Sequence, residues 1–161
     1  MNKLLTYKLN FKPSRFYKYF IILTYLMEKK LIAPCGMNCG ICKYYYREKN
    51  TCLGCRSQDK GNPITRFSCT VRECKILKER KWKYCSDKCD KYPCKRLKAL
   101  DKRYSTKYHM SMLENLKYID EHGINSFLKK EKKKWTCPKC GGIVTCHGGM
   151  CLSCGLVKFK N

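Results

Sequence analysis

Four cysteines near the end of the chain have the spacing that a tetrahedral metal ion requires. Cys137 and Cys140 form one CxxC pair, Cys151 and Cys154 form a second, and ten residues separate the two pairs. A tetrahedral ion with metal–sulfur bonds of about 2.3 Å needs sulfurs roughly 3.8 Å apart, and the two-residue turn inside each pair provides that separation. The pattern predicts a zinc site. A rubredoxin-like iron site is the alternative, because spacing alone does not distinguish the two metals.

A second set of paired cysteines repeats this design in the first half of the chain. Cys39, Cys42, Cys52 and Cys55 again form two CxxC pairs, here separated by nine residues. We therefore expect a second four-thiolate site at these residues.

The remaining cysteines have looser spacings and leave the ligand pairing open. A third metal site is predicted at Cys69, Cys74, Cys85 and Cys89, with Cys35 and Cys94 as alternative ligands. Cys146 and His147 lie between the two C-terminal pairs and are interpreted as a free thiol and a surface imidazole. Two or three zinc ions are therefore expected, with iron or a [4Fe–4S] cluster as the alternative cofactor.

One triplet of cysteines resembles a catalytic motif. Cys35, Cys39 and Cys42 form CxxxCxxC, the spacing with which radical SAM enzymes hold a [4Fe–4S] cluster. Those enzymes need a large barrel around the cluster, and only about 120 residues follow this triplet. We therefore set radical chemistry aside, while a plain iron–sulfur site remains an alternative.

Signatures of catalysis are otherwise absent from the sequence. It contains no HExxH, Walker loop, GxGxxG or GxSxG motif, and its three histidines lie in separate segments. A zinc ion with four cysteine ligands also has no open position for water or substrate, so the predicted sites are structural. The sequence favours a protein that is not an enzyme.

The cysteine count bears on the compartment. Fifteen cysteines cannot all pair within one chain, and several stand at the spacing of metal-binding turns, so metal is favoured over disulfides and a cytoplasmic location is expected. The apolar run from Tyr19 to Met27 is followed by charged residues without a signal-peptide cleavage site. Its nine residues are also too few to span a bilayer, so no membrane association is expected.

The charge of the chain raises nucleic acid as an alternative partner. The formal net charge is +24, and three zinc ions with four thiolates each would reduce it to about +18, because each such site carries −2. Lysine outnumbers arginine 28 to 8, which favours a solvated surface over bidentate recognition of phosphates and bases. A basic run beside an aromatic residue is the candidate nucleic-acid site, formed by Lys129, Lys130, Lys132, Lys133, Lys134 and Trp135.

The distribution of cysteines divides the chain into four parts. Residues 1–26 contain none and are expected to be a disordered or non-native extension, residues 27–94 a cysteine-rich metal-binding module, residues 95–134 a helical segment and residues 135–161 a zinc ribbon. In the helical segment apolar residues recur at helical spacing, with Ser111 as a cap and Gly123 as a stop. In the last part short apolar runs beside the paired cysteines predict β-strands. The predicted fold class is a small, metal-stabilised α+β protein.

Longer motifs carry a family resemblance. The runs LIAPCGMNCGICKYY, CLGC and YPC, followed by DKRYSTKYHMSMLENLKYI and WTCPKCGG, span about residues 30–155. They are similar to the uncharacterised cysteine-rich family numbered 3795 among domains of unknown function (DUF3795). The resemblance implies a small cytoplasmic protein and implies no activity. Together with the motifs, it leads us to expect a zinc-binding scaffold whose partner is another protein, with nucleic-acid binding and iron–sulfur or redox function as alternatives.

Overall fold

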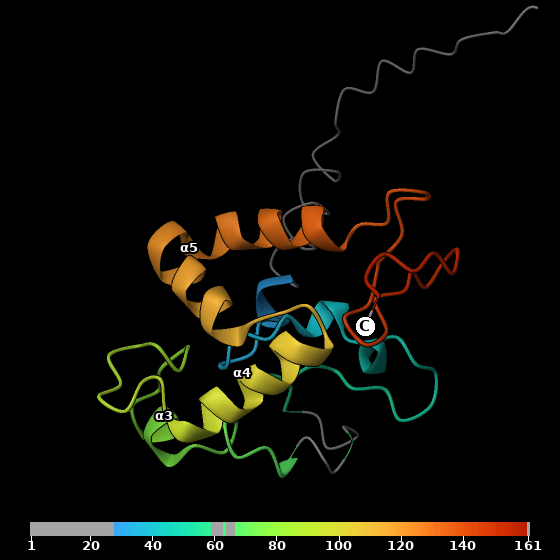
Figure 1. Ribbon diagram of the computed structural model, residues 1–161. Coiled ribbons are helices and arrows are strands. Elements are labelled where there is room, and N and C mark those ends of the chain that lie inside the picture. The colour runs from blue at the N-terminus through green and yellow to red at the C-terminus, as the bar shows by residue number, and fades with distance from the viewer. Residues whose placement is uncertain (1–27, 59–62, 64–66, 161) are drawn as a thin grey trace, which may run out of the picture.

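Helices joined by cysteine-bearing loops make up the described part of the chain. The computed structural model describes residues 28–58, 63 and 67–160. Two 3₁₀ helices, η1 (Cys39–Ile41) and η2 (Lys43–Tyr45), precede three α-helices, α3 (Lys75–Glu79), α4 (Lys95–Lys107) and α5 (Met112–Trp135). Figure 1 shows α4 and α5 side by side, with the segment that begins at residue 28 between them. The predicted extension, residues 1–26, lies outside the described residues.

The two long helices form where apolar spacing predicted them. Ser111 caps α5, since its hydroxyl accepts a hydrogen bond from the Glu114 N–H at 3.1 Å. The same hydroxyl donates to the carboxylate of Asp101 in α4 at 2.8 Å, which fixes the turn between the helices. Gly123 has φ 76° and ψ 161°, so α5 consists of two helical halves that meet at a bend.

The core lies where the first loop meets α4, α5 and the C-terminal segment. Fully buried side chains from all four regions pack into one cluster that includes Ala33, Leu97, Leu116 and Val144. Asn115 in α5 donates to the Gly36 carbonyl at 2.9 Å, and the buried carboxylate of Glu131 accepts a hydrogen bond from Asn38 at 3.1 Å. These two contacts tie both halves of α5 to the first loop.

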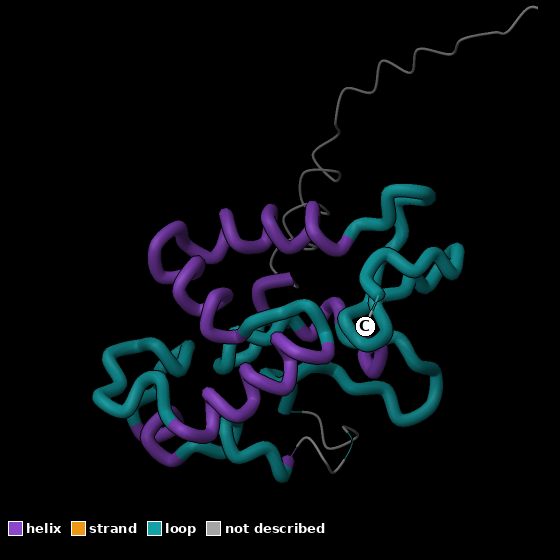
Figure 2. Tube along the Cα trace, in the orientation of Figure 1, coloured by secondary structure: helices purple, strands orange, loops and turns teal. Residues whose placement is uncertain are grey.

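The β-strands expected in residues 135–161 are not confirmed. The described part of this segment has only three isolated antiparallel bridges, Thr136 to Ile143, Val144 to Cys151 and Met150 to Val157, and Figure 2 shows it as loop. The turns around the paired cysteines take up most of this segment, so only single residue pairs are left to form antiparallel bridges. The described residues therefore form a small, helix-rich fold.

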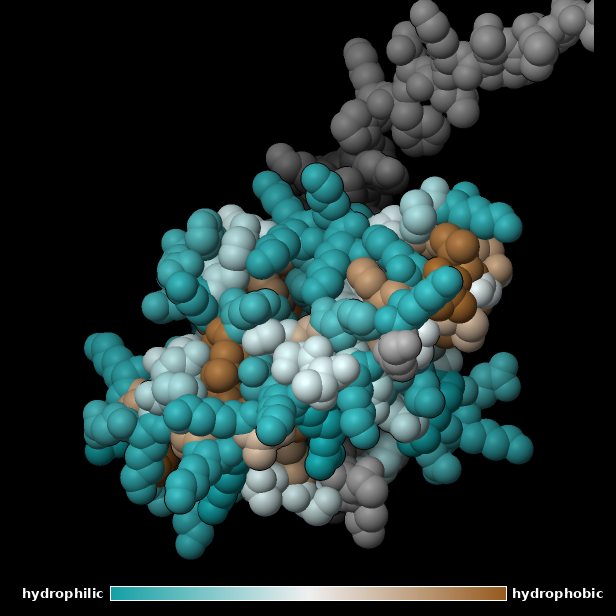
Figure 3. Space-filling view, in the orientation of Figure 1, coloured by the Kyte–Doolittle hydropathy of each residue, from teal (hydrophilic) through white to brown (hydrophobic). Residues whose placement is uncertain are grey.

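The face of the molecule drawn in Figure 3 is mainly polar, with charged and hydrophilic residues over most of it and a hydrophobic patch over the C-terminal segment. The exposed apolar residues of that segment are Ile143, Met150, Leu152 and Val157. None of the helices in the described segments is long and apolar enough to cross a lipid bilayer.

Candidate metal centres

The two C-terminal cysteine pairs lie on turns with the same hydrogen-bonding pattern. In the first turn the Gly141 N–H donates to the Cys137 carbonyl at 2.9 Å, and the Cys137 N–H donates to the Gly142 carbonyl at 2.7 Å. The second turn repeats both bonds, from Gly155 to Cys151 at 3.1 Å and from Cys151 to Leu156 at 2.9 Å. Each CPKCGG or CLSCGL segment thus folds by local bonds into a cysteine knuckle.

The two knuckles bring four sulfurs together. One ligand atom from each of Cys137, Cys140, Cys151 and Cys154 lies within 4.8 Å of the other three. The sulfur separations of 3.6 Å from Cys137 to Cys154 and from Cys140 to Cys151 are close to the roughly 3.8 Å of a tetrahedral thiolate site. This set can hold a metal ion, as the CxxC spacing predicted, and all fifteen cysteines of the chain are free of disulfides.

The backbone of the second knuckle favours a thiolate. The N–H of Cys154 donates to the Cys151 sulfur and lowers the pKa of that thiol; burial opposes the shift, and the Ser153 N–H reinforces it. Metal binding needs deprotonated sulfur, so these N–H groups prepare Cys151 as a ligand before any metal binds.

The thiols of the predicted first-module site interact with one another, but no three of them bring their sulfurs within 4.8 Å. The Cys55 thiol, hydrogen-bonded to Cys39, and burial together raise the pKa of Cys39 well above its usual range. Burial likewise raises the pKa of Cys42, and the thiols of Cys52 and Cys55 add to this shift. Gly54, between Cys52 and Cys55, has φ +88°, and a Cβ there would stand 3.4 Å from the Cys39 Cβ. The CLGC turn therefore packs directly on the CGIC turn of η1.

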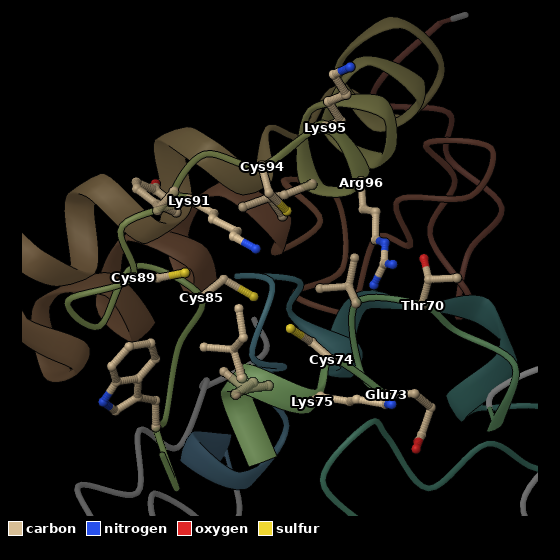
Figure 4. A pocket seen from close by; sticks show the side chains of 16 residues that line it. Thr70, Glu73, Cys74, Lys75, Cys85, Cys89, Lys91, Cys94, Lys95 and Arg96 are labelled. Atoms are coloured by element: carbon tan, nitrogen blue, oxygen red, sulfur yellow. The ribbon is translucent and has the colours of Figure 1, made fainter. Parts of the chain in front are cut away.

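Four of the remaining cysteines of the first module line one cavity. A cavity of about 500 Å³ is lined by Cys74, Cys85, Cys89 and Cys94 (Figure 4). Three of these were predicted as the third site, but Cys69 is absent from the cavity lining and Cys94 takes part in it. Cys35, the other alternative ligand, is buried. Burial raises the pKa of its thiol, and among the other thiols Cys55 adds most to this shift.

Cys146 is a free thiol, as the sequence indicated, but it is buried, and His147 is half-buried where a surface imidazole was expected. Cys146 is 1% exposed, and its N–H donates to the carbonyl of Ile41 in η1 at 2.9 Å. The His147 ring is half-buried among three tyrosines, at centroid distances of 5.3 Å to Tyr44, 5.9 Å to Tyr104 and 4.7 Å to Tyr108. Burial, together with the charge of Lys43, lowers the pKa of His147. Tyr44 and the α4 pair Tyr104 and Tyr108 lie far from each other and from His147 in the sequence, so no local signal marked this contact.

The basic run of α5 is divided between different faces. Trp135 is 3% exposed, so it is unavailable for stacking on a base, and that part of the nucleic-acid prediction is wrong. Lys130 lies 4.0 Å from the centroid of the Tyr118 ring, and Lys134 donates to the His109 carbonyl at 2.7 Å.

The other three predicted lysines share one groove. An open depression of about 540 Å³ is lined by Lys129, Lys132, Lys133 and Lys158 together with Thr136, Cys137 and Pro138. Lys158 comes from the C-terminal segment and was missed in the sequence, because it is separated from the basic run by both knuckles. Its ammonium group donates to the carbonyls of Lys134 and Thr136 at 2.6 and 3.0 Å, which holds it beside the end of α5.

Paired thiols in small loops define the chain as a cysteine-rich protein in which four sulfurs are placed so that they could hold a metal ion. Residues 31–99 match the model of a family described as a protein of unknown function (DUF3795), which confirms the resemblance for the first module and the start of α4. The match ends before α5 and the C-terminal knuckles. Comparison with curated proteins and with solved structures gave no match.

Proposed function

We propose that this protein is a zinc-stabilised, non-catalytic scaffold that makes contacts with another protein. The observation that carries the proposal is the set of four sulfurs from Cys137, Cys140, Cys151 and Cys154 within 4.8 Å of one another. Zn²⁺ prefers tetrahedral thiolate sets of this kind, and four protein ligands leave no position for water or substrate. Such an ion holds a fold together and does no chemistry.

The modest core supports a structural role for the metal. The described residues bury two apolar clusters, and cysteines contribute a large share of the main one. A structural zinc ion supplies about 10 to 16 kcal/mol of binding energy that becomes folding energy, more than the net stability of many domains. Metal therefore stabilises the positions of loops that the apolar side chains alone hold weakly.

A protein partner is supported by the apolar surface of the knuckles. Ile143, Met150, Leu152 and Val157 are between 39% and 49% exposed on a segment whose backbone the metal would hold rigid. These are four of the eight large apolar or aromatic side chains that are exposed among the described residues. Exposed apolar residues that gather on one part of a surface are typical of contact sites for other proteins.

Cobalt substitution tests whether the C-terminal site is closed. Co²⁺ replaces zinc and reports its coordination through visible absorption, so the Co²⁺-loaded protein should show a tetrahedral thiolate spectrum that azide or imidazole leaves unchanged. Cys140→Ser should open one position and make the spectrum respond to either added ligand. A response in the unaltered protein would contradict the scaffold proposal, since it would reveal an open coordination position.

Nucleic-acid binding is the second candidate, supported by the groove that four lysines line. Lys129, Lys132, Lys133 and Lys158 surround one depression although they come from two segments. Backbone phosphates that bind there would release counterions, so affinity should fall steeply with salt. The burial of Trp135 removes the stacking partner, so the groove would track a phosphate backbone without reading bases.

Two double variants with the same loss of charge test this candidate. Lys132→Gln with Lys133→Gln removes two groove lysines, while Lys117→Gln with Lys130→Gln removes two lysines outside the groove lining. Fluorescence anisotropy with a single-stranded oligonucleotide should show binding that weakens about tenfold or more in the first variant only and has a smaller salt slope. Equal effects of both variants would indicate attraction by net charge and eliminate the groove as a site.

A further inference from the structure

Four cysteines surround a cavity that the C-terminal site does not involve. The cavity of about 500 Å³ lies between the start of α3, the loop of residues 85–94 and the start of α4. Figure 4 shows the sulfurs of Cys74 and Cys85 facing the same space, with Cys94 entering from the start of α4 and Cys89 from the loop. Thiols from three separate elements thus converge on one volume.

Backbone contacts fix the positions of these thiols. Cys74 and Cys94 are the N-cap residues of α3 and α4, and the side chain of neither makes a capping hydrogen bond. Their carbonyls accept the first helical bonds, from Lys78 at 3.1 Å and Lys98 at 3.0 Å. Cys85 is fixed by its own N–H, which donates to the Pro34 carbonyl at 2.8 Å. The sulfurs of the two N-caps are therefore held at the cavity while remaining available as ligands.

Much of the remaining wall of the cavity is apolar, including Val71, Ile76, Leu77, Trp82 and Leu97. Apolar surroundings limit the access of water to a metal centre and strengthen the attraction between thiolate ligands and a bound cation.

Basic residues at the same cavity complement a metal centre with net negative charge. A zinc ion with four thiolates carries charge −2, and an iron–sulfur cluster with four thiolates is also an anion. The cavity is bordered by Lys75, Lys91, Lys95 and Arg96, against a single acidic residue, Glu73. The side chains around the cavity therefore carry an excess of positive charge, which a negatively charged metal–thiolate centre would balance.

We propose that Cys74, Cys85, Cys89 and Cys94 are the ligands of a second metal–thiolate centre, which joins the N-terminal ends of α3 and α4. The geometry selects Cys94 over Cys69, because Cys94 lines the cavity and Cys69 does not. This set shares no ligand with the proposed C-terminal zinc site, so either assignment can be disproved without the other.

The sulfurs of this set are farther apart than those of the C-terminal site. Among the described residues only Cys137, Cys140, Cys151 and Cys154 bring their ligand atoms within 4.8 Å of one another. A single zinc ion would draw the four cavity thiols together. The thiolates of a [4Fe–4S] cluster bind four different iron atoms and stand farther apart than the ligands of one ion. Both centres use the same soft-metal, thiolate chemistry, so the experiment has to separate them.

Cadmium NMR of the full-length, unaltered chain tests the ligand set directly. Protein reconstituted anaerobically with ¹¹³Cd²⁺ should give a four-sulfur resonance correlated with the β-protons of Cys74, Cys85, Cys89 and Cys94. A separate resonance correlated with Cys137, Cys140, Cys151 and Cys154 serves as the internal reference for a folded chain. A correlation with Cys69 in place of Cys94, or no cadmium signal from the cavity cysteines, would overturn the proposal.

Metal analysis of two variants gives an independent readout. Cys94→Ser should lose the metal of this centre completely while retaining the C-terminal ion, and Cys69→Ser, the matched control from the same module, should retain both. Loss of the centre in Cys69→Ser but not in Cys94→Ser would refute the assignment. Anaerobic isolation then separates the two forms: one further zinc without sulfide indicates a single ion, whereas about four iron atoms with acid-labile sulfide indicate a cluster.

Discussion

Cys140 is the most exposed member of the C-terminal thiol set, so its substitution can test metal binding without disturbing the core. Cys137 and Cys151 are buried and also fill space in the core, so replacing either would combine loss of a ligand with loss of packing. Cys140 is exposed and contributes no side chain to the buried cluster. Its substitution therefore isolates the contribution of the metal–sulfur bond.

We predict that Cys140→Ser strongly weakens zinc binding at this site and lowers stability through the metal alone. Loss of a direct ligand should cost more than the roughly 10- to 100-fold in affinity that follows loss of a residue that only orients a ligand. Competition with a chromophoric chelator measures the affinity for zinc. The temperature of thermal unfolding should be lower than that of the unaltered protein only when zinc is present. Ser153→Ala, an exposed neighbour, is the control, and a similar loss in that variant would contradict the interpretation.

Glu131 makes stability depend on pH in a defined direction. Its carboxyl is 3% exposed, and burial raises its pKa above 4.5, although the hydrogen bond from Asn38 opposes the shift. A raised pKa in the fold means that folding favours the protonated acid. The stability that Glu131 contributes is therefore present below its unfolded pKa and is lost as pH rises through the folded pKa.

Glu131→Gln should be equal in stability to the unaltered protein in acid and more stable near neutral pH. The Gln side chain keeps an acceptor for Asn38 but carries no charge to bury, so the difference should grow as pH rises from about 4.5. Urea unfolding of both zinc-loaded proteins across this range measures it, and any metal loss in acid affects both alike. Glu79→Gln, on the exposed surface, should show no such trend, and a constant difference for Glu131→Gln would refute the argument.

At the scale of elements, α5 docks on the first loop through a position that only glycine can occupy. Gly36 has φ +84°, and a Cβ there would lie 2.7 Å from the Met112 carbonyl oxygen and 2.9 Å from the Leu116 Cγ. The Asn115 amide bonds the Gly36 carbonyl at the same point. The backbone of the loop therefore lies directly against the first half of α5.

We predict that Gly36→Ala destabilises the fold by about 2 to 5 kcal/mol, through strain at positive φ together with overpacking against α5. Gly148→Ala is the control, because Gly148 also has positive φ but no heavy atom within 4 Å of its Cβ position. Chemical denaturation of the two variants should show the larger loss for Gly36→Ala. Equal losses would mean that strain alone acts and that the contact with α5 contributes nothing.

Elements that depend on local sequence were predictable, and those that depend on distant residues were not. The apolar spacing and the Ser111 cap were sufficient for α5, and the CxxC turns were sufficient for the C-terminal thiol set, because each is formed by neighbours in the chain. The predicted β-strands are not confirmed, because the two knuckles leave only single bridged residue pairs in the described part of the segment. The burial of Trp135, the position of Lys158 and the place of Cys94 in the cavity lining depend on the packing of helices and loops, which no spacing within a segment reports.

At the scale of the whole molecule, the two cysteine modules share one core. Cys39 and Ile41 of the first module pack in the same buried cluster as Val144 and Cys151 of the C-terminal segment. A domain whose parts share a core unfolds cooperatively. Metal removed from either module should therefore destabilise both.

We predict that chelation under anaerobic, reducing conditions unfolds the described region in one transition. Far-UV circular dichroism would follow α4 and α5, and fluorescence would follow the tryptophans, including Trp135 at the end of α5, which should become solvent-exposed in the same step. Zinc should restore both signals and magnesium neither, since thiolates bind soft metals. Helical signal that survives complete metal removal would show that the apolar core suffices alone.

The main-chain bond from Cys146 to Ile41 also bears on the order in which metals load. It joins the segment between the C-terminal knuckles to the carbonyl just before Cys42, so a metal that orders the C-terminal knuckles also restrains the backbone of the first module. By reciprocity, a metal that orders one site must raise the affinity of the other by the same factor that it receives in return. Zinc titration should then be cooperative, and fully loaded and empty chains should outnumber the half-loaded species in native mass spectra.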